Sequence, residues 1–230
     1  MKLVLFDVDG TLVDSQNIIV AAQQATFAAH GLEPPSRERA LSIVGLSLAE
    51  AFTALAGPKA PIADLVATYR EVSAVLRRDP AHAEPLFPGA GECIAALRDR
   101  REVALGIATG NSQRGVARIL DSFGWHGVFA SIQTADDAPS KPHPGMILQA
   151  MRATGVAPHE TVMIGDSSFD MAMARAAGVM SVGVSWGFQP VAALNEAGAG
   201  AIVHSYAELA TVLDDFLDRS IQILPSQIPA

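Results

Sequence analysis

The sequence is short of the features that mark several large classes of protein. It has one cysteine, Cys93, in 230 residues, which excludes an internal disulfide and a cysteine zinc cluster, and we expect its thiol in the core. No apolar stretch approaches the roughly 20 residues that cross a membrane. The apolar run at the amino terminus is cut by Asp7 and Asp9 before it reaches the length of a signal peptide. We therefore expect no membrane association and a cytoplasmic location.

Positive charge is also scarce. The chain has 16 lysines and arginines against 24 aspartates and glutamates, a formal net charge of −8, and its arginines are scattered without forming a basic stripe. A nucleic acid is therefore not an expected partner. A small anionic ligand can still bind where a few positive groups and a metal ion gather locally.

Apolar runs alternate with helical patterns along most of the chain. Each run is typical of a strand that is buried on both faces of a parallel sheet. The runs cover residues 2–9, 103–110, 129–135, 161–167, 181–187 and 201–206. Helical patterns occupy residues 92–100, 113–123, 144–154 and 170–177, and a terminal helix follows the last run. The sequence therefore predicts an α/β fold, a doubly wound parallel sheet with a Rossmann-like core.

The first strand breaks this rhythm, because no convincing strand follows it for about 70 residues. Helical patterns instead cover residues 16–30, 36–44, 48–56 and 62–78. We expect an inserted all-helical cap domain at residues 15–83, a catalytic core formed by residues 1–14 and 84–220, and a loose C-terminal tail at residues 221–230. Asp14 and Ser15 are expected to cap the first helix of this insertion.

Polar residues gather at the carboxyl ends of the predicted strands, where open parallel sheets bind ligands. Asp7 and Asp9 lie two residues apart, so their side chains are expected on one face of the first strand, and Asp166 ends the fourth strand. Three carboxylates repel one another unless a cation lies between them. Since no histidine or cysteine cluster accompanies them, this oxygen site suits Mg²⁺ better than zinc.

These residue types also supply the parts that phosphoryl transfer requires. Asp7 can attack phosphorus, and Asp9 can act as general acid and then as general base. Thr109, Gly110 and Asn111 can donate hydrogen bonds to the transferring group, and Lys141 can supply a fixed positive charge. One further carboxylate, that of Asp170, is expected to orient the lysine or to bind the metal through water.

Four motifs carry a resemblance to a known family. They are Asp7-Val8-Asp9-Gly10-Thr11, Thr109-Gly110-Asn111, Lys141-Pro142 and Gly165-Asp166-Ser167-Ser168-Phe169-Asp170. In this order they resemble the haloacid dehalogenase superfamily, in its branch with an inserted helical cap, and most of all its phosphoglycolate phosphatase group. The resemblance implies that Asp7 is nucleophile and metal ligand, that Asp9 is the acid/base and binds Mg²⁺ through its backbone carbonyl, and that Asp166 is the third protein ligand.

The resemblance extends to the cap but leaves the reaction open. The loop of residues 44–47 resembles one that reaches over the site in this branch, so Gly45 and Ser47 are expected to touch the substrate. The expected reaction is hydrolysis of a small-molecule phosphate ester. A phosphomutase and a catalytically silent phosphate- and magnesium-binding regulator are the alternatives, and Asp9 and Thr11 favour the phosphatase pattern.

The substrate and the assembly are the least defined parts of this reading. By resemblance 2-phosphoglycolate is the leading substrate, while sugar phosphates, nucleotides and pyrophosphate stay open. The expected assembly is a monomer or a homodimer. We expect His143 to be a loop residue, and Trp186 and Phe188 to pack in the core instead of bordering the pocket.

Overall fold

A single parallel sheet forms the centre of the computed structural model, which describes residues 1–218. The predicted tail therefore lies outside the described residues. The sheet has the strand order β3-β2-β1-β4-β5-β6. Its strands are β1 (Lys2–Phe6), β2 (Val103–Ala108), β3 (Ser131–Gln133), β4 (Thr161–Gly165), β5 (Met180–Val184) and β6 (Ala201–Val203). Each strand falls within one predicted apolar run or extends one residue beyond its start, and the doubly wound α/β fold is confirmed.

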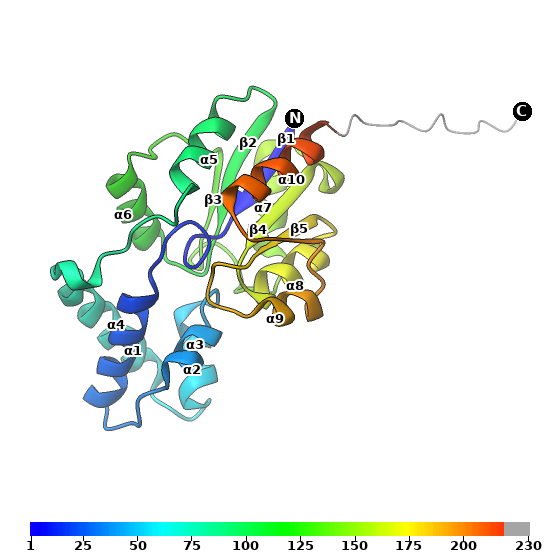
Figure 1. Cartoon of the computed structure of the whole chain (residues 1–230). Helices are drawn as coiled ribbons and strands as arrows, with labels where there is room; N and C mark the ends of the chain where they lie inside the picture. The colour runs from blue at the N-terminus through cyan, green and yellow to red at the C-terminus, as the bar shows by residue number, and fades with distance from the viewer. Residues whose placement is uncertain (219–230) are drawn as a thin grey trace, which may run out of the picture.

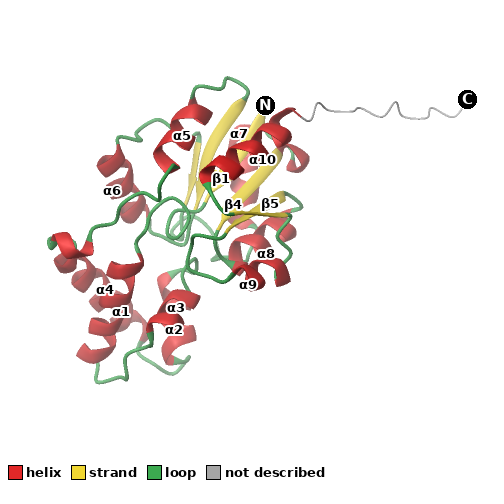
Figure 2. Ribbon diagram, in the orientation of Figure 1, coloured by secondary structure: helices red, strands yellow, loops and turns green. Residues whose placement is uncertain are grey.

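Helices connect the strands and cover the sheet (Figure 2). After β1 come α1 (Gln16–Ala29), α2 (Arg37–Ser42), α3 (Leu48–Ala56) and α4 (Ile62–Leu76), and later in the chain α5 (Ala90–Arg98), α6 (Gln113–Phe123), α7 (Gly145–Thr154), α8 (Ser168–Ala177), α9 (Val191–Glu196) and α10 (Tyr206–Asp218). Short 3-10 helices occupy Pro80–His82 and Pro158–Glu160. Within residues 1–218, none of the helices is long and apolar enough to cross a membrane.

The alternation of side chains along β1 divides the core between the two faces of the sheet. Val4 and Phe6 pack in one apolar cluster with residues of α5, α6 and α10. Leu3 and Leu5 pack in the other with residues of α7 and α8. Successive side chains of a strand point to opposite faces of the sheet. Since helices cover both faces, all four side chains are fully buried. The strand thus lies at the centre of the molecule, and its carboxyl end is held firmly.

The helices α1–α4, called the helical cap below, have an apolar cluster of their own. Its buried members are Phe27, Phe52, Leu55 and Leu65, and the ring centroids of Phe27 and Phe52 lie 6.1 Å apart. Figure 1 shows these helices grouped beyond the carboxyl ends of the strands. The four helices lie where the sequence placed them, whereas the domain boundaries near residues 14 and 84 stay a prediction.

Several element boundaries differ from the sequence prediction. The strand β1 ends at Phe6, so Asp7 and Asp9 lie beyond the strand and the argument from strand alternation does not apply to them. The six-residue helix α9 was not predicted, because fewer than two turns give too little periodicity to recognise. The chain bends sharply after β1, where the amides of Thr11, Leu12 and Val13 all donate to the carbonyl of Val8.

Candidate active site

A cavity of about 310 Å³ lies between the carboxyl ends of the strands and the helical cap. Seven of the residues singled out from the sequence line it, and these are Asp7, Asp9, Gly45, Ser47, Thr109, Gly110 and Asn111. The other three, Asp166, Lys141 and Asp170, do not line the cavity. They are buried behind Asp7. The predicted residues therefore form two groups, one that lines the cavity and one that is buried, and Asp7 contacts both.

Lys141 joins two of the inner carboxylates. Its side chain is fully buried, and its Nζ lies 2.9 Å from Asp7 Oδ1 and 2.6 Å from Asp170 Oδ1. Both carboxylates raise the pKa of Lys141 above its ordinary value, against the effect of its burial. Lys141 therefore stays charged and occupies a fixed position beside Asp7.

Asp170 is held in place by Ser167. Its Oδ2 accepts hydrogen bonds from the amide of Ser167 at 3.1 Å and from the Ser167 hydroxyl at 2.6 Å, while the Ser167 hydroxyl accepts from the amide of Asp170. This is a capping box at the start of α8. With Lys141 on its other oxygen, Asp170 has partners on both oxygens.

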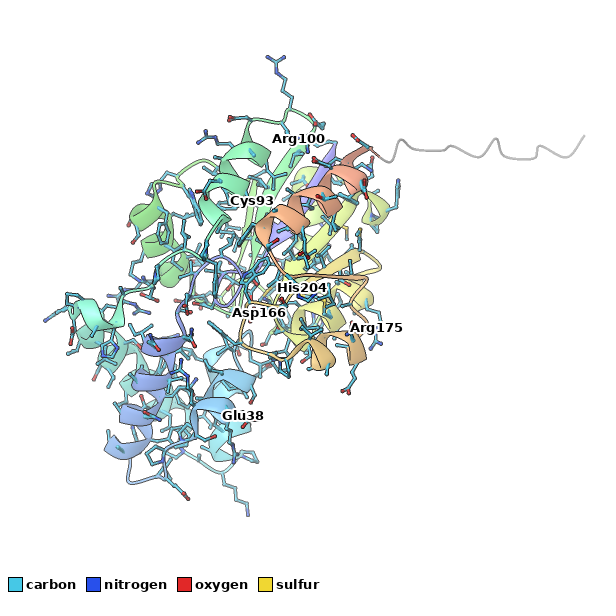
Figure 3. All side chains as sticks on the ribbon, viewed as in Figure 1. Glu38, Cys93, Arg100, Asp166, Arg175 and His204 are labelled. Carbon is cyan, nitrogen blue, oxygen red and sulfur yellow. The ribbon has the colours of Figure 1, made fainter. Side chains whose placement is uncertain are left out.

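Asp166 follows β4 and is also buried. Its Oδ1 accepts a hydrogen bond from the Thr11 hydroxyl at 3.1 Å, and its Oδ2 accepts one from the amide of Phe188 at 2.8 Å. The backbone of Gly10 lies so close that a Cβ there would be 2.2 Å from Asp166 Oδ2, and its φ is +86°. Only glycine combines this conformation with this approach. Figure 3 shows Asp166 between the sheet and the helical cap.

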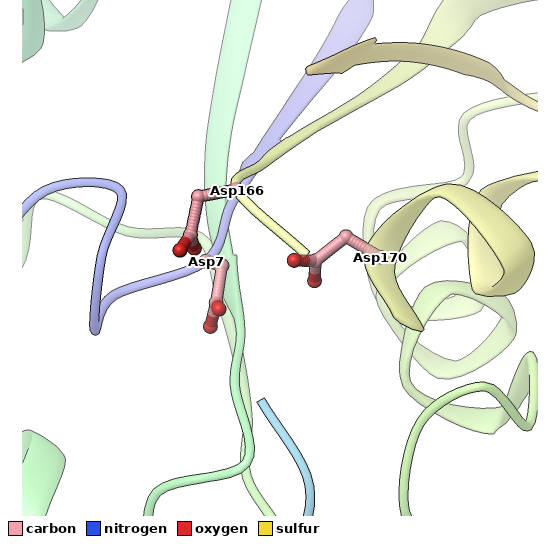
Figure 4. A group of neighbouring side chains, drawn as sticks. All are labelled: Asp7, Asp166 and Asp170. Carbon is pink, nitrogen blue, oxygen red and sulfur yellow. The ribbon is translucent and has the colours of Figure 1, made fainter. Parts of the chain in front are cut away.

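The carboxylates of Asp7, Asp166 and Asp170 converge, with one oxygen of each within 4.8 Å of the others (Figure 4). Burial is the largest cause and raises the pKa of Asp7 to about 7; the charge of Lys141 acts in the opposite direction, and the charges of Asp170 and Asp9 add smaller increases. Burial and the charges of Asp7 and Asp170 also raise the pKa of Asp166 well above its ordinary value. Such a group is costly to keep ionised unless a cation compensates it.

The oxygens of Asp7 identify where a metal ion fits. Both are buried, and neither has a hydrogen-bond partner within residues 1–218, although Lys141 lies beside one of them. Buried polar atoms without partners are rare and call for an explanation. Carboxylate oxygens are the ligands that hard divalent cations prefer. The residues present therefore fit a metal ion at Asp7 and Asp166, and the identity of the metal is taken up under the proposal.

Asp9 lies on the cavity wall and is turned toward two donors. The Ser15 hydroxyl donates to Asp9 Oδ1 at 2.6 Å, and Asn111 Nδ2 donates to Asp9 Oδ2 at 3.1 Å. Burial raises the pKa of Asp9 above its ordinary value, and these two hydrogen bonds act in the opposite direction. Ser15 occupies the predicted N-cap position of α1, but its hydroxyl makes no hydrogen bond to the helix.

The loop of residues 44–47 contacts the strand ends directly. A Cβ at Gly110 would lie 2.4 Å from the carbonyl oxygen of Gly45, so the close approach requires glycine at this position. The amide of Ser47 donates to the hydroxyl of Ser140 at 2.8 Å, and the Ser47 hydroxyl accepts from Glu50 at the start of α3. The helical cap therefore rests on the core at this loop.

Thr109 is buried beside this contact, and its hydroxyl accepts a hydrogen bond from the amide of Asn111 at 3.2 Å.

The residues expected in the core or in a loop behave as predicted in part. Trp186 packs against the core cluster and donates to the carbonyl of Thr11 at 3.0 Å. Phe188 is half-buried, and its amide donates to Asp166 Oδ2. His143 is a loop residue whose Nδ1 accepts from Gly145.

Cys93 packs partly buried against the core cluster on α5, and burial raises the pKa of its thiol to about 12. This confirms the expected core thiol.

Sequence reasoning assigned no role to four other residues at the site, namely Gln23, Tyr69 and Glu84 on the cavity wall and Ser167 behind it. Only Ser167 had a usable signal, because serine followed three residues later by an acidic residue at a helix start is typical of a capping box.

The fold and the buried carboxylates at its strand ends define a class of hydrolase. A profile of the family described as haloacid dehalogenase-like hydrolase matches residues 4–184. The chain belongs to this family. A solved structure of a haloacid dehalogenase-like hydrolase from Streptococcus pneumoniae superposes with a TM-score of 0.79 at 28% identity, covering 93% of this chain and 98% of that one.

Two relatives narrow the class further. The phosphoglycolate phosphatase of Rhodospirillum rubrum is 34% identical over 219 residues, which are 90% of this chain and 89% of the relative. The pyrophosphatase PpaX of Oceanobacillus iheyensis is 28% identical over 216 residues, which are 94% of this chain and 98% of the relative. The chain is a phosphatase of the haloacid dehalogenase-like family.

Proposed function

We propose that this protein is a Mg²⁺-dependent phosphatase that hydrolyses a small-molecule phosphate monoester through an aspartyl-phosphate on Asp7. The observation that carries the proposal is the state of Asp7. Its carboxylate lines the cavity, has no hydrogen-bond partner within the described residues, and lies beside the buried charge of Lys141. A nucleophile needs this combination of free oxygen atoms, fixed position and access to substrate.

The metal would be held by the carboxylates of Asp7 and Asp166 together with the main-chain carbonyl of Asp9. Mg²⁺ suits this set, because it prefers oxygen ligands and commonly keeps several waters. When bound, it neutralises charge that develops on the phosphoryl oxygens. Asp166 is oriented for this role by the Thr11 hydroxyl and the Phe188 amide, so the loops after β1 and β5 both position it.

In the first step a carboxylate oxygen of Asp7 attacks phosphorus. The bond from Asp7 oxygen to phosphorus forms, the bond from phosphorus to the ester oxygen breaks, and the protonated form of Asp9 gives its proton to the departing alkoxide. Lys141 lies 2.9 Å from Asp7 Oδ1 and offsets the negative charge that the phosphoryl group brings. The Thr109 hydroxyl, which accepts from the amide of Asn111, and the amide of Gly110 offer donors to the phosphoryl oxygens.

In the second step water hydrolyses the intermediate. Asp9, now ionised, takes a proton from the water as the water oxygen bonds to phosphorus, and the bond from phosphorus to Asp7 breaks to release phosphate. The contacts of Asp9 suit this exchange. Ser15 and Asn111 hold its two oxygens and favour the ionised form, while burial favours the protonated form. The two states are therefore closer in free energy than for an exposed aspartate.

The names of the relatives supply the first substrates to examine. One is a phosphoglycolate phosphatase and another a pyrophosphatase, so the expected substrate is a small phosphate compound. The test is phosphate release from a panel of monoesters and pyrophosphate, with Mg²⁺ and with EDTA. We expect release only with Mg²⁺. Isomerisation of a sugar phosphate that depends on an added sugar bisphosphate and releases no phosphate would instead support the phosphomutase.

Two variants examine the assigned residues. We expect Asp7→Asn to abolish turnover without changing the far-UV circular dichroism spectrum, and Asp9→Asn to accumulate a phosphorylated protein in acid-quenched samples. Glu33→Gln is a suitable control, because Glu33 is an exposed residue of the helical cap. Full activity of Asp9→Asn without a trapped phosphoenzyme would remove Asp9 from the mechanism. A phosphorylated wild-type chain that releases no phosphate would support the silent regulator.

A further inference from the structure

The wall that the helical cap contributes to the cavity is mainly apolar. It faces Asp7 and Asp9, which lie on the opposite side of the cavity. Its aliphatic members are Ile19, Ile43, Val44, Leu46, Leu48 and Val66. A ligand whose phosphoryl group lies at Asp7 therefore places its leaving group against this wall. Cavities that enclose drug-sized ligands begin at about 300 Å³, so this one has room for more than a two-carbon acid.

Gln23, on α1, is an unusual polar residue in this wall. Its side chain is 4% exposed, and its Nε2 donates to the carbonyl of Ala40 at 3.3 Å. Because a carbonyl can only accept a hydrogen bond, the Gln23 atom that faces it must be Nε2. The other polar atom of the Gln23 amide is therefore Oε1. Within residues 1–218, Oε1 has no hydrogen-bond partner although it is buried. Leaving such an acceptor unpaired is costly, and a donor on the ligand would satisfy it.

Tyr69 offers a second polar group on the same wall. Its ring packs edge-on against Phe52, with the ring centroids 5.6 Å apart, which fixes the direction of the phenol. Burial, followed by the negative charge of Asp9, raises the pKa of Tyr69 to about 12. The phenol therefore remains protonated at neutral pH and can donate a hydrogen bond. One acceptor and one donor are thus set into an apolar surface.

The same wall offers little to a second anionic group. The guanidinium of Arg77 is engaged with Glu84, with Nε 3.0 Å from Oε2, and Arg118 holds the same carboxylate. Arg70 lines the cavity but is exposed, and an exposed ion pair contributes little. A carboxylate on the leaving group would instead meet the lone pairs of Gln23 Oε1, which repel it.

We propose that Gln23 and Tyr69 form a leaving-group subsite that selects a neutral, hydroxyl-bearing alcohol, as found in sugar and polyol phosphates. The inference rests on the proposed phosphatase activity and narrows its substrate class. Gln23 Oε1 accepts a hydrogen bond from a hydroxyl of the leaving group, Tyr69 donates one, and the aliphatic side chains cover the carbon chain. The subsite disfavours 2-phosphoglycolate, whose leaving group carries a carboxylate.

The experiment compares two esters with five carbon atoms each, ribose 5-phosphate and n-pentyl phosphate, in the presence of Mg²⁺. The readout is the ratio of their kcat/KM values. We expect this ratio to exceed ten in the wild-type enzyme and to fall about tenfold in Gln23→Met, which keeps the side-chain length but removes the acceptor. Gln24→Met is the matched control, because Gln24 is the next residue of α1 and is exposed. It should keep the wild-type ratio.

A second variant guards against misfolding. Gln23→Asn keeps the amide but withdraws it by one methylene, and it should also lower the ratio, with folding checked by circular dichroism. An unchanged ratio in the folded Gln23 variants would overturn the subsite, as would a higher kcat/KM for 2-phosphoglycolate than for ribose 5-phosphate in the wild-type enzyme. Both outcomes leave the phosphatase proposal intact. If no ester in the panel were hydrolysed, the phosphatase proposal would fail, and the subsite with it.

Discussion

Replacing Lys141 with methionine removes the ammonium group from between Asp7 and Asp170 and leaves a side chain of similar length. In the wild-type protein this ammonium lies 2.9 Å from one carboxylate and 2.6 Å from the other, and all three side chains are buried. The variant would leave two buried carboxylates without their cation. We expect a loss of stability that depends on pH, together with a loss of activity.

The size of the effect follows from two limits. Removing one partner of a buried ion pair typically costs about 3–5 kcal/mol. A carboxyl group can escape this cost by binding a proton, which costs about 1.4 kcal/mol for each pH unit above its ordinary pKa, or about 4 kcal/mol at pH 7. We therefore expect Lys141→Met to lower the free energy of unfolding by about 3–4 kcal/mol at pH 7 and by about 1–2 kcal/mol at pH 5.

Urea unfolding in EDTA at both pH values measures this difference, and Lys59→Met is the control because Lys59 is exposed. Phosphate release by the variant in Mg²⁺ should fall at least a hundredfold, as when one electrostatic donor is removed from an active site. A loss of less than 1 kcal/mol at pH 7, or a loss equal at both pH values, would refute the reasoning from buried charge.

Three further predictions concern the metal site, the contact with the helical cap and the loop after β1. Because the folded-state pKa of Asp7 is raised to about 7 from 3.8, the metal-free protein should lose stability as the pH rises from about 4 through 7. Mg²⁺ should consequently raise the melting temperature more at pH 8 than at pH 5, and equal shifts in thermal melts would contradict this. Gly110→Ala places a Cβ against the main-chain carbonyl oxygen of Gly45 in the loop of residues 44–47. We expect kcat/KM to fall about ten- to a hundredfold and the Mg²⁺ titration to stay unchanged. Wild-type kinetics in this variant would show that the close contact between Gly110 and Gly45 is not needed for activity. Tyr206→Phe removes a hydrogen bond of 2.7 Å to the carbonyl of Thr11, and this carbonyl also accepts a hydrogen bond from Trp186. We expect the free energy of unfolding, measured in urea, to fall by about 1 kcal/mol. A fall of more than about 3 kcal/mol would mean that the hydrogen bond from Trp186 does not satisfy the carbonyl by itself.

The six strands could be predicted because a parallel strand covered on both faces needs an unbroken apolar run. Their ends could not. The predicted run of residues 2–9 includes Val8, which is buried although it lies beyond the end of β1, so burial of apolar side chains does not mark where the hydrogen-bonded ladder stops. What ends β1 is the turn in which three amides converge on the carbonyl of Val8. The pair Asp9-Gly10 signals a turn in this region but does not mark the residue at which the strand ends.

The same difficulty applies to side chains whose partner is distant in the sequence. Ser15 precedes a helix, and local rules assign its hydroxyl to the helix amides. In the folded chain that hydroxyl lies 2.6 Å from Asp9 Oδ1 instead, because the turn after β1 brings the two residues together. Gln23 is a similar case. A glutamine in a helix is normally solvated, and only the packing of α1 against the cavity reveals its buried, unpaired oxygen.

The contacts of the three inner carboxylates distinguish between them, where spacing alone could not. Asp170 uses both oxygens, with Lys141 on one and two donors of Ser167 on the other. Asp166 accepts one hydrogen bond on each oxygen, so each oxygen still has a lone pair that can bind a cation. Asp7 accepts no hydrogen bond from within the described residues. The capacity to bind a cation thus falls from Asp7 to Asp166 to Asp170. Of the two roles that the sequence left open for Asp170, these contacts favour holding Lys141 in place over binding the metal. Asp170 then acts on Asp7, the proposed nucleophile, by fixing the position of Lys141 beside it.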